Sequence, residues 1–228
     1  MAVANVGRLL ARQSVASSRQ TLLIDWDLKA PSLPFYFTIS QPAERGLIEY
    51  FHDLAHLLRG RRASTPEYGT GFPSTLAAEL PLDRYLCRTD EPGLAIMTAG
   101  ALNGNIGSYR KLVATFDWVS LFEEHPFAIE AFRSVLRSLF AAVLIDSRTG
   151  ISGSSGFCTA LMPDKLVAVF GPNQQNLKII EVVEAALEFR RMSDDLDPLL
   201  VFPLASRFDQ SDLYAPGQSL NTYRTSFR

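Results

Sequence analysis

Acidic residues follow two apolar segments of the chain directly. Asp25 and Asp27 come at the end of the run that begins at Thr21, and Asp146 ends the run that begins at Ala141. A buried carboxylate is costly unless a cation, a metal or backbone N–H groups compensate it. Two strands that present acids at one sheet edge therefore indicate a hydrated Mg²⁺ held beside phosphates. The same acids could instead cap helices or accept hydrogen bonds from loop N–H groups.

A segment rich in glycine and small hydroxyl residues follows Asp146. Residues 147–156 read Ser-Arg-Thr-Gly-Ile-Ser-Gly-Ser-Ser-Gly. Glycine gives the backbone conformational freedom, and serine and threonine hydroxyls can bind phosphate or water. A sensor of the γ-phosphate needs these properties, because it must order and disorder with the nucleotide. A plain surface loop is the alternative.

The elements that must position these residues alternate along the chain. Short apolar runs predict strands at 21–25, 93–98, 141–146, 165–170 and 198–204. Helical spacing predicts helices at 2–13, 46–58 and 177–190, and two helices within 109–139 that are broken near Pro126. This order predicts an α/β fold, a doubly wound, mostly parallel sheet with helices on both faces, in one domain over residues 1–228. Residues 59–81 are expected to be an exposed loop or insertion.

Composition excludes several classes of protein. Of 228 residues, 47% are hydrophobic and 20% charged, which is typical of a globular chain and not of a disordered one. The net charge of -2 gives no overall attraction to nucleic acid or anionic lipid. Cys87 and Cys158 have no metal-ligand spacing, and His52 and His56 lack a carboxylate partner in a zinc-type motif. We expect a cytoplasmic protein with reduced thiols.

Three segments, taken in order, resemble the ParA/MinD-type (deviant Walker) P-loop ATPases. Residues 22–33 read LLIDWDLKAPSL, residues 143–150 read VLIDSRTG and residues 201–209 read VFPLASRFD. The first resembles the family's strand that ends in Asp-x-Asp, the second its Walker B strand and second switch, and the third its strand and base-contact loop. The pattern is most similar to bacterial ATPases whose P-loop reads Lys-Gly-Gly-Val-Gly-Arg.

The resemblance implies roles for individual residues. Asp27 would orient the attacking water or a metal-bound water, and Asp25 would support the same switch. Asp146 would hold Mg²⁺ through water, and the backbone N–H of Gly150 would reach the γ-phosphate. Arg148 is either a cation that faces phosphate or a solvated surface charge.

The third segment bears on the nucleotide base. Ser206, Arg207 and Asp209 would line the edge of the base pocket, as a loose relative of the Asn-Lys-x-Asp element of P-loop GTPases. The resemblance implies adenine, whereas the loop with its aspartate leaves guanine open.

The implied function is that of an Mg²⁺-dependent, ATP-hydrolysing switch protein that forms a homodimer with ATP and acts on an unknown protein partner. The alternative is a catalytically inactive pseudo-ATPase, a binding module of the same fold. A bacterial P-loop tyrosine kinase is a third reading, for which the chain offers only Tyr214 and Tyr223 near its end. DNA or membrane contact is not indicated, because Arg59, Arg61 and Arg62 form the one basic cluster of the sequence.

The sequence has no Walker A loop. Neither Gly-x-x-x-x-Gly-Lys-Ser/Thr nor another Gly-rich loop precedes Asp25, and the first predicted helix begins without a capping residue. We therefore expect a fold whose first strand is missing from these residues, with Met1 internal to a longer protein and a further cut after the polar segment from Ser211. Expressed alone, these residues are expected to be poorly stable and to bind nucleotide very weakly.

This expectation can be checked in the gene. The DNA directly upstream of the Met1 codon should continue in frame for about 15–40 residues that carry an apolar strand and a Gly-rich loop. Sequencing of the genomic locus tests this, and a stop codon immediately before Met1 would contradict it.

Overall fold

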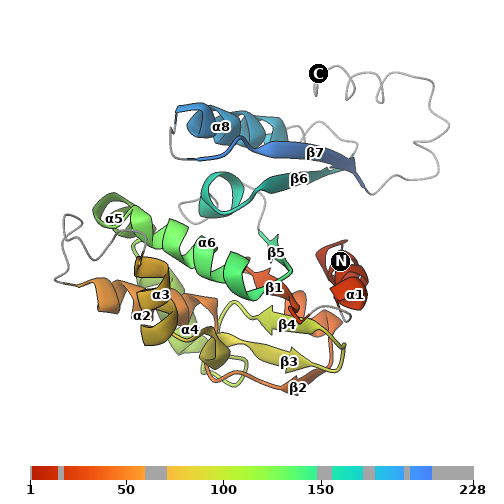
Figure 1. The fold of residues 1–228 in the computed structure, drawn as a ribbon, viewed down its shortest axis with the longest axis vertical. Helices are drawn as coiled ribbons and strands as arrows, with labels where there is room; N and C mark the ends of the chain where they lie inside the picture. The colour runs from red at the N-terminus through yellow and green to blue at the C-terminus, as the bar shows by residue number, and fades with distance from the viewer. Residues whose placement is uncertain are drawn as a thin grey trace. The chain divides into compact units, whose positions relative to one another are not determined.

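Residues 2–14, 18–59, 71–147, 156–171, 178–192 and 196–206 are described in a computed structural model of the chain. The chain divides into two units, Met1–Arg148 and Thr149–Arg228 (Figure 1). The single domain over residues 1–228 remains a prediction.

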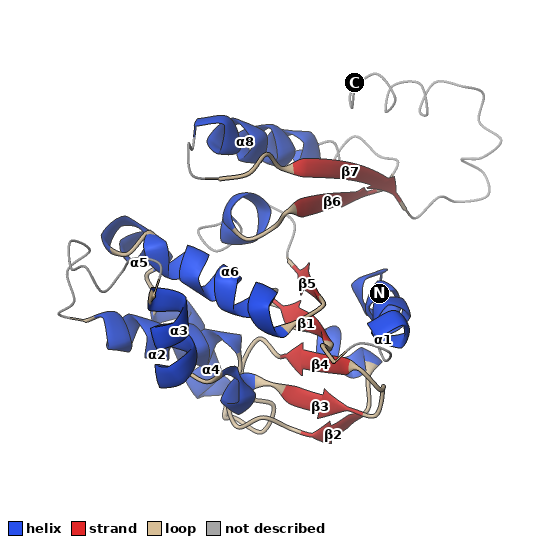
Figure 2. Ribbon diagram, viewed as in Figure 1, coloured by secondary structure: helices blue, strands red, loops and turns tan. Residues whose placement is uncertain are grey.

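The first unit is built around a mixed sheet with the strand order β2-β3-β4-β1-β5. Its strands are β1 (Thr21–Asp25), β2 (Ile39–Gln41), β3 (Cys87–Thr89), β4 (Leu94–Met97) and β5 (Ala142–Asp146). β1 pairs in parallel with both β4 and β5, whereas β3 pairs antiparallel with β4 and β2 antiparallel with β3 (Figure 2). The parallel strands are the three that the apolar runs predict in this unit.

Strand β1, which lies between β4 and β5, is buried along its whole length. All five residues of its Thr-Leu-Leu-Ile-Asp sequence are buried, as a strand covered on both faces requires. β5 lies at the end of the sheet, and all of its residues are half-buried. Among the described residues β5 pairs with β1 alone.

Helix α1 (Ala2–Ser14) covers one face of this sheet through small side chains. Its buried residues are Ala4, Gly7, Ala11 and Ser14, which recur at helical spacing. A Cβ at Gly7 would come within 2.7 Å of Cδ2 of Leu23, so glycine allows the helix to lie close to β1. Figure 1 shows α1 on one side of the sheet and the other helices of the unit on the opposite side. These are α2 (Leu47–Leu58), α3 (Phe72–Glu79), α4 (Ile106–Thr115), α5 (Trp118–Glu124) and α6 (Phe127–Leu139).

Two predicted segments differ from the structure. The 109–139 segment forms three helices, because the Asp117 side chain accepts a hydrogen bond from the Ser120 N–H and starts α5 after an extended Phe116. The predicted break at Pro126 is confirmed, since Pro126 is the N-cap of α6. The expected loop at 59–81 contains helix α3, whose Phe72 and Leu76 are buried, while residues 60–70 lie outside the described part.

A glycine allows the start of α2 to lie against the end of β4. Gly46 is the N-cap of α2, and the next two N–H groups, of Leu47 and Ile48, donate to the Thr98 and Ala99 carbonyls at 2.8 and 3.1 Å. A Cβ at Gly46 would lie 2.5 Å from the Thr98 carbonyl oxygen and 2.7 Å from the Gly100 Cα. Backbone atoms cannot move aside as a flexible side chain does, so glycine is required at this crossing.

The second unit is a two-stranded parallel sheet with one helix against it. η4 (Phe157–Leu161), a π-helix, precedes β6 (Lys165–Phe170), α8 (Lys178–Met192) and β7 (Leu200–Ala205). The buried guanidinium of Arg190 donates to the carbonyls of Ala160, Leu161, Pro163 and Asp197, so it satisfies acceptors left by η4. The other face of the sheet presents exposed apolar side chains within this unit: Val167, Val169, Leu200, Phe202 and Leu204.

None of the helices in the described part of the chain is long and apolar enough to cross a membrane.

The close contact between α2 and β4 predicts that a methyl group added at Gly46 strongly destabilises the fold. Gly46→Ala should lower the free energy of unfolding by about 1–3 kcal/mol, because the added Cβ overlaps backbone atoms. Gly71→Ala is the matched control: Gly71 is also an N-cap, and a Cβ there would meet nothing within 4 Å. Urea unfolding of both variants measures the difference, and equal destabilisation would contradict the close contact.

Candidate functional site

The predicted acids meet at the carboxyl ends of β1 and β5. Asp25 and Asp146 are register partners on the two parallel strands. The Trp26 N–H donates to the Asp146 carbonyl at 2.8 Å, so the pairing extends one residue beyond β1. Asp27 follows within the same turn, and its charge influences the pKa of Asp146. The structure therefore brings together all three of the acids that the sequence singles out.

Asp25 is buried completely and holds the following loop. One carboxylate oxygen accepts hydrogen bonds from the backbone N–H groups of Ser32 and Leu33 at 3.0 and 2.9 Å. The other oxygen accepts from the Asp27 N–H at 3.3 Å. The pKa of Asp25 is raised to about 6, mainly by burial and also by the charge of Asp146, although the backbone hydrogen bonds oppose the change. This environment makes Asp25 a structural anchor of the loop.

Asp27 has a different environment. It is half-buried, and one of its oxygens accepts from the N–H groups of Lys29 and Ala30 at 3.3 and 3.1 Å. This side-chain turn fixes the carboxylate relative to its own loop. Its second oxygen accepts no hydrogen bond from the described residues, so it is the acid best placed to bind a water or a ligand.

Asp146 is half-buried at the end of the outer strand β5. Burial raises the pKa of its carboxyl group, and the carboxylate of Asp27 contributes to the same shift. Three carboxyl groups gathered at one edge of the sheet form a site where a bound cation would be stabilised.

Magnesium fits the chemistry of these donors. Within the described ranges no group of three or more His, Cys, Asp or Glu side chains could enclose a metal by itself. Mg²⁺ does not need such a cage, because it usually keeps several waters and takes one or two carboxylates together with phosphate oxygens. Asp146 and the second oxygen of Asp27 would be available to the ion or to its bound waters, whereas the oxygens of Asp25 are already used by backbone N–H groups.

Two further residues, Tyr109 and Glu49, lie near the acids, and no sequence motif indicates them. The Tyr109 hydroxyl, from α4, donates to the Leu28 carbonyl at 2.7 Å. The Glu49 carboxylate accepts from the N–H groups of Gly46 at 2.9 Å and Ala101 at 3.4 Å, so it joins α2 to the end of β4. These residues lie far from Asp25 along the chain, and no periodicity or motif links them to it.

The structure does not place the remaining predicted residues relative to the acids. Arg148, Gly150, Arg207 and Asp209 lie outside the described residues. Ser206 follows β7 in the second unit, where its backbone N–H donates to the Phe170 carbonyl at 2.7 Å. Their proposed contacts with nucleotide remain predictions.

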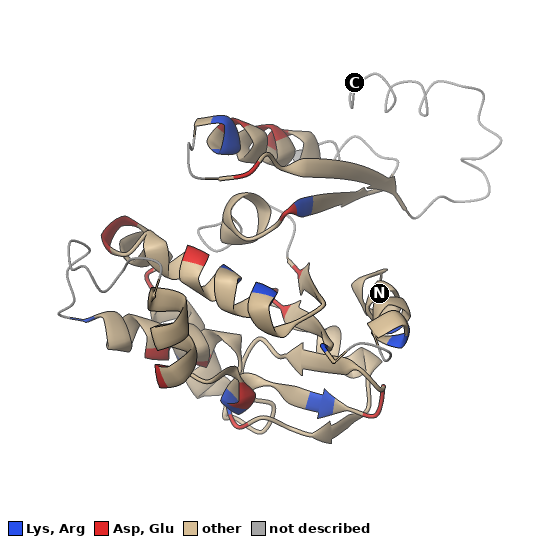
Figure 3. Cartoon of the chain, viewed as in Figure 1, with Lys and Arg blue, Asp and Glu red and all other residues tan. Residues whose placement is uncertain are grey.

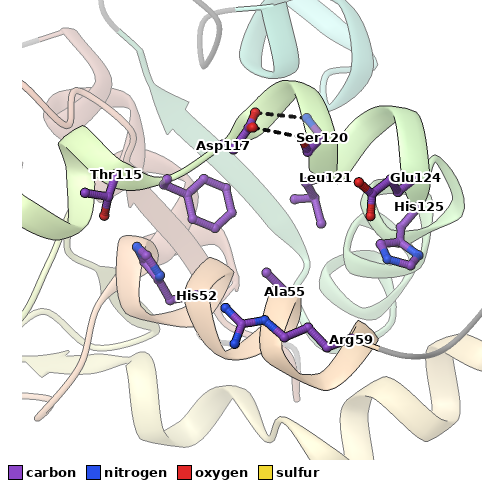
Figure 4. Close-up of a pocket in the computed structure, with 10 residues that line it drawn as sticks. His52, Ala55, Arg59, Thr115, Asp117, Ser120, Leu121, Glu124 and His125 are labelled. Atoms are coloured by element: carbon purple, nitrogen blue, oxygen red, sulfur yellow. Dashed lines mark hydrogen bonds between the residues drawn. The ribbon is translucent and has the colours of Figure 1, made fainter.

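A pocket of about 720 Å³ lies elsewhere in the first unit, between α2 and α5 (Figure 4). None of the predicted site residues lines it. His52 belongs to its wall, and the Nε2 atom of this ring lies 3.0 Å from the Leu112 carbonyl oxygen. Asp117, also in the wall, is occupied by the Ser120 N–H and hydroxyl, as the dashed lines in Figure 4 show.

Comparison with known proteins identifies the fold. No model of a protein family matches the chain, and neither does any curated protein. The cell division ATPase MinD of Pyrococcus furiosus is 17% identical, and the match covers 98% of this chain and 72% of that chain with a TM-score of 0.53. A ParA family ATPase from Chlorobium tepidum TLS is 12% identical over 98% of this chain and 80% of that chain, with a TM-score of 0.54. A plasmid partition protein from Borrelia burgdorferi is 13% identical over 97% of this chain and 80% of that chain, with a TM-score of 0.52.

The chain has the fold of the ParA/MinD-type P-loop ATPases. The predicted fold class is confirmed: the protein is an α/β protein whose central sheet is mostly parallel and flanked by helices.

The raised pKa of Asp25 predicts a pH dependence of stability. Because the folded state holds this proton more tightly than the unfolded state, whose pKa is about 4, the contribution of Asp25 is full below pH 4 and is lost as the pH rises through about 6. The difference in free energy of unfolding between the wild type and Asp25→Asn should therefore fall by about 2–3 kcal/mol between pH 4 and pH 7. Urea unfolding at both pH values measures this. The exposed Asp83→Asn serves as control, and a difference that does not change with pH would contradict the assignment.

Proposed function

We propose that the protein is an Mg²⁺-dependent switch that binds and hydrolyses ATP. The observation that carries the proposal is the meeting of Asp25, Asp27 and Asp146 at the carboxyl ends of two adjacent parallel strands, in a chain with the ParA/MinD-type fold. In open α/β sheets, ligands bind beyond the carboxyl ends of the strands. Acids at this edge repel a triphosphate unless a divalent cation lies between them, so the site favours a metal–nucleotide complex.

Each of the three acids would have a different role. Asp146 would hold Mg²⁺ through water, and Asp27, with an oxygen free of hydrogen bonds from the described residues, would orient the attacking water. Asp25 would keep the Asp27 loop in place through its backbone hydrogen bonds. The bound Mg²⁺ would supply charge neutralisation on the phosphates.

Phosphoryl transfer requires positioning and electrostatic stabilisation rather than covalent chemistry from the protein. Among the described residues, the hydrogen-bond partners of Asp27 are the backbone N–H groups of Lys29 and Ala30, which cannot act as a general base, so we expect a slow turnover. Slow hydrolysis suits a switch, because the nucleotide state must persist long enough to be read by a partner.

Most of the residues that we propose to contact the nucleotide lie beyond the described part. The N–H of Gly150 would sense the γ-phosphate, and Arg148 would face it or remain in solvent. Ser206, Arg207 and Asp209 would line the adenine edge. ATP would bring two copies together as a homodimer that acts on a protein partner.

Figure 3 shows basic and acidic segments scattered over the described elements rather than gathered on one of them. A protein partner is therefore proposed ahead of DNA or an anionic membrane.

The test compares the complete protein that the gene encodes with its Asp146→Ala variant. Mg²⁺-dependent ATP hydrolysis should fall at least about 100-fold in Asp146→Ala, since loss of a metal ligand removes several kcal/mol of stabilisation. Asp83→Ala, an exposed acid away from the site, should hydrolyse ATP as the wild type does. Steady-state phosphate release and equilibrium ATP binding give both measurements. If the wild type does not bind ATP, the proposal fails in favour of the pseudo-ATPase binding module.

A further inference from the structure

Apart from the packing of the buried Trp26, Leu28 and Leu33 side chains, the loop that carries Asp27 is held mainly by hydrogen bonds among its own atoms. Within residues 25–33, the carboxylates of Asp25 and Asp27 accept hydrogen bonds from backbone N–H groups of the same segment. The Leu28 N–H donates to the Trp26 carbonyl at 2.9 Å, which closes the turn further. Such contacts give the loop a shape, but they do not fix that shape relative to the sheet.

Two hydrogen bonds tie this loop to other described elements. The first joins the Trp26 N–H to the Asp146 carbonyl at the start of the loop. The second is the bond of 2.7 Å from the Tyr109 hydroxyl to the Leu28 carbonyl, one residue after Asp27. Tyr109 therefore supplies the tether on the far side of Asp27.

The Tyr109 ring is itself fixed. Asn105 caps α4 by accepting the N–H groups of Gly107 and Ser108 at 2.8 and 3.2 Å, and this sets the first turn from which Tyr109 projects. The ring lies against Gly100, where a Cβ would come within 2.4 Å of Cδ2 and 2.5 Å of Cε2. The hydroxyl is thus presented to Leu28 by a ring with little freedom.

The surroundings keep this hydroxyl a donor. Burial raises the pKa of Tyr109, and the nearby carboxylates of Asp25, Glu49 and Asp27 raise it further. The proton therefore stays on the oxygen across the physiological range, and the bond to the Leu28 carbonyl persists.

We propose that Tyr109 is the positioning residue of the candidate site: through the Leu28 carbonyl it holds the Asp27 turn at the carboxyl edge of β1. The proposal rests on the proposed function, in which Asp27 orients the attacking water. Tyr109 does not contact the reacting groups and acts through Asp27.

The position of α4 favours this role over a general contribution to the core. Helix α4 contains no fully buried residue, and its Ile106 is 64% exposed. Removal of one hydroxyl leaves the Tyr109 ring on Gly100, so the helix keeps its apolar contact while the loop loses its tether.

The first experiment compares Tyr109→Phe with the wild type in the complete protein. The value of kcat should fall about tenfold while KM for ATP changes less than about twofold, because a displaced Asp27 affects the reaction more than binding. Tyr36→Phe is the matched control, since the Tyr36 hydroxyl makes no hydrogen bond with the described residues. Equal kcat values for Tyr109→Phe and the wild type overturn the proposal.

A double-mutant cycle tests whether Tyr109 acts through Asp27. In an Asp27→Ala background, Tyr109→Phe should change kcat by less than about twofold, because the group that it positions is gone. A further tenfold loss in that background overturns the proposal, since Tyr109 would then act independently.

Hydrogen exchange separates this proposal from the proposed function. In Tyr109→Phe the amides of Lys29 and Ala30 should exchange at least about fivefold faster, because one hydrogen bond no longer restrains the turn. The amides of Ser32 and Leu33, which Asp25 holds, should keep their rates. Unchanged exchange at Lys29 and Ala30 overturns the role of Tyr109 whatever the activity, whereas a wild type without ATP turnover contradicts the proposed function alone.

Discussion

The removal of the Asp25 carboxylate from water is the constraint on which the candidate site depends. Asp25 ends a strand whose residues are all buried, so protein groups must replace its hydration. The chain meets this need by turning back until the N–H groups of Ser32 and Leu33 reach the carboxylate. The turn leaves Asp27 half-buried with an oxygen that no described residue occupies. The hydrogen bonds that compensate the burial of Asp25 thus also leave one oxygen of Asp27 available to a water or a ligand.

Aromatic packing fixes the same turn from the other side. Trp26 lies between the two acids, is almost fully buried, and has its ring 5.3 Å from Phe51 and 5.9 Å from Trp118. Phe51 and Trp118 belong to α2 and α5, so the strand end is attached to two helices by side-chain packing and to α4 by the Tyr109 hydroxyl. The indole Nε1 of Trp26 has no hydrogen-bond partner among the described residues. The packing of the ring must therefore outweigh the free-energy cost of burying this N–H group.

The sequence is informative where the chemistry is local. The runs that end in Asp25 and Asp146 predict two parallel strands with acids at one edge, because parallel strands present their carboxyl ends on the same side. Tyr109 and Glu49 could not be predicted, since they reach the site through close backbone contacts at Gly46 and Gly100. Strands β2 and β3, of three residues each, are too short to produce an alternating pattern. Asp117 has the sequence character of a cap, but the apolar residues around it continue the helical pattern across it.

The pairing of β1 also determines when the site can form during synthesis. β1 is inserted between β4 and β5, and the residue that pairs with Thr21 on the outer side is Ala142, which emerges 121 residues later. At typical translation rates of about 5–20 residues per second, the emerging β1 waits roughly 6–25 s for that neighbour. During this interval an apolar strand that ends in an acid has one edge without its final partner, a state in which nascent chains aggregate. The fold therefore makes assembly of the acidic site a late event on the ribosome and gives early binding of a chaperone to residues 21–25 a physical basis.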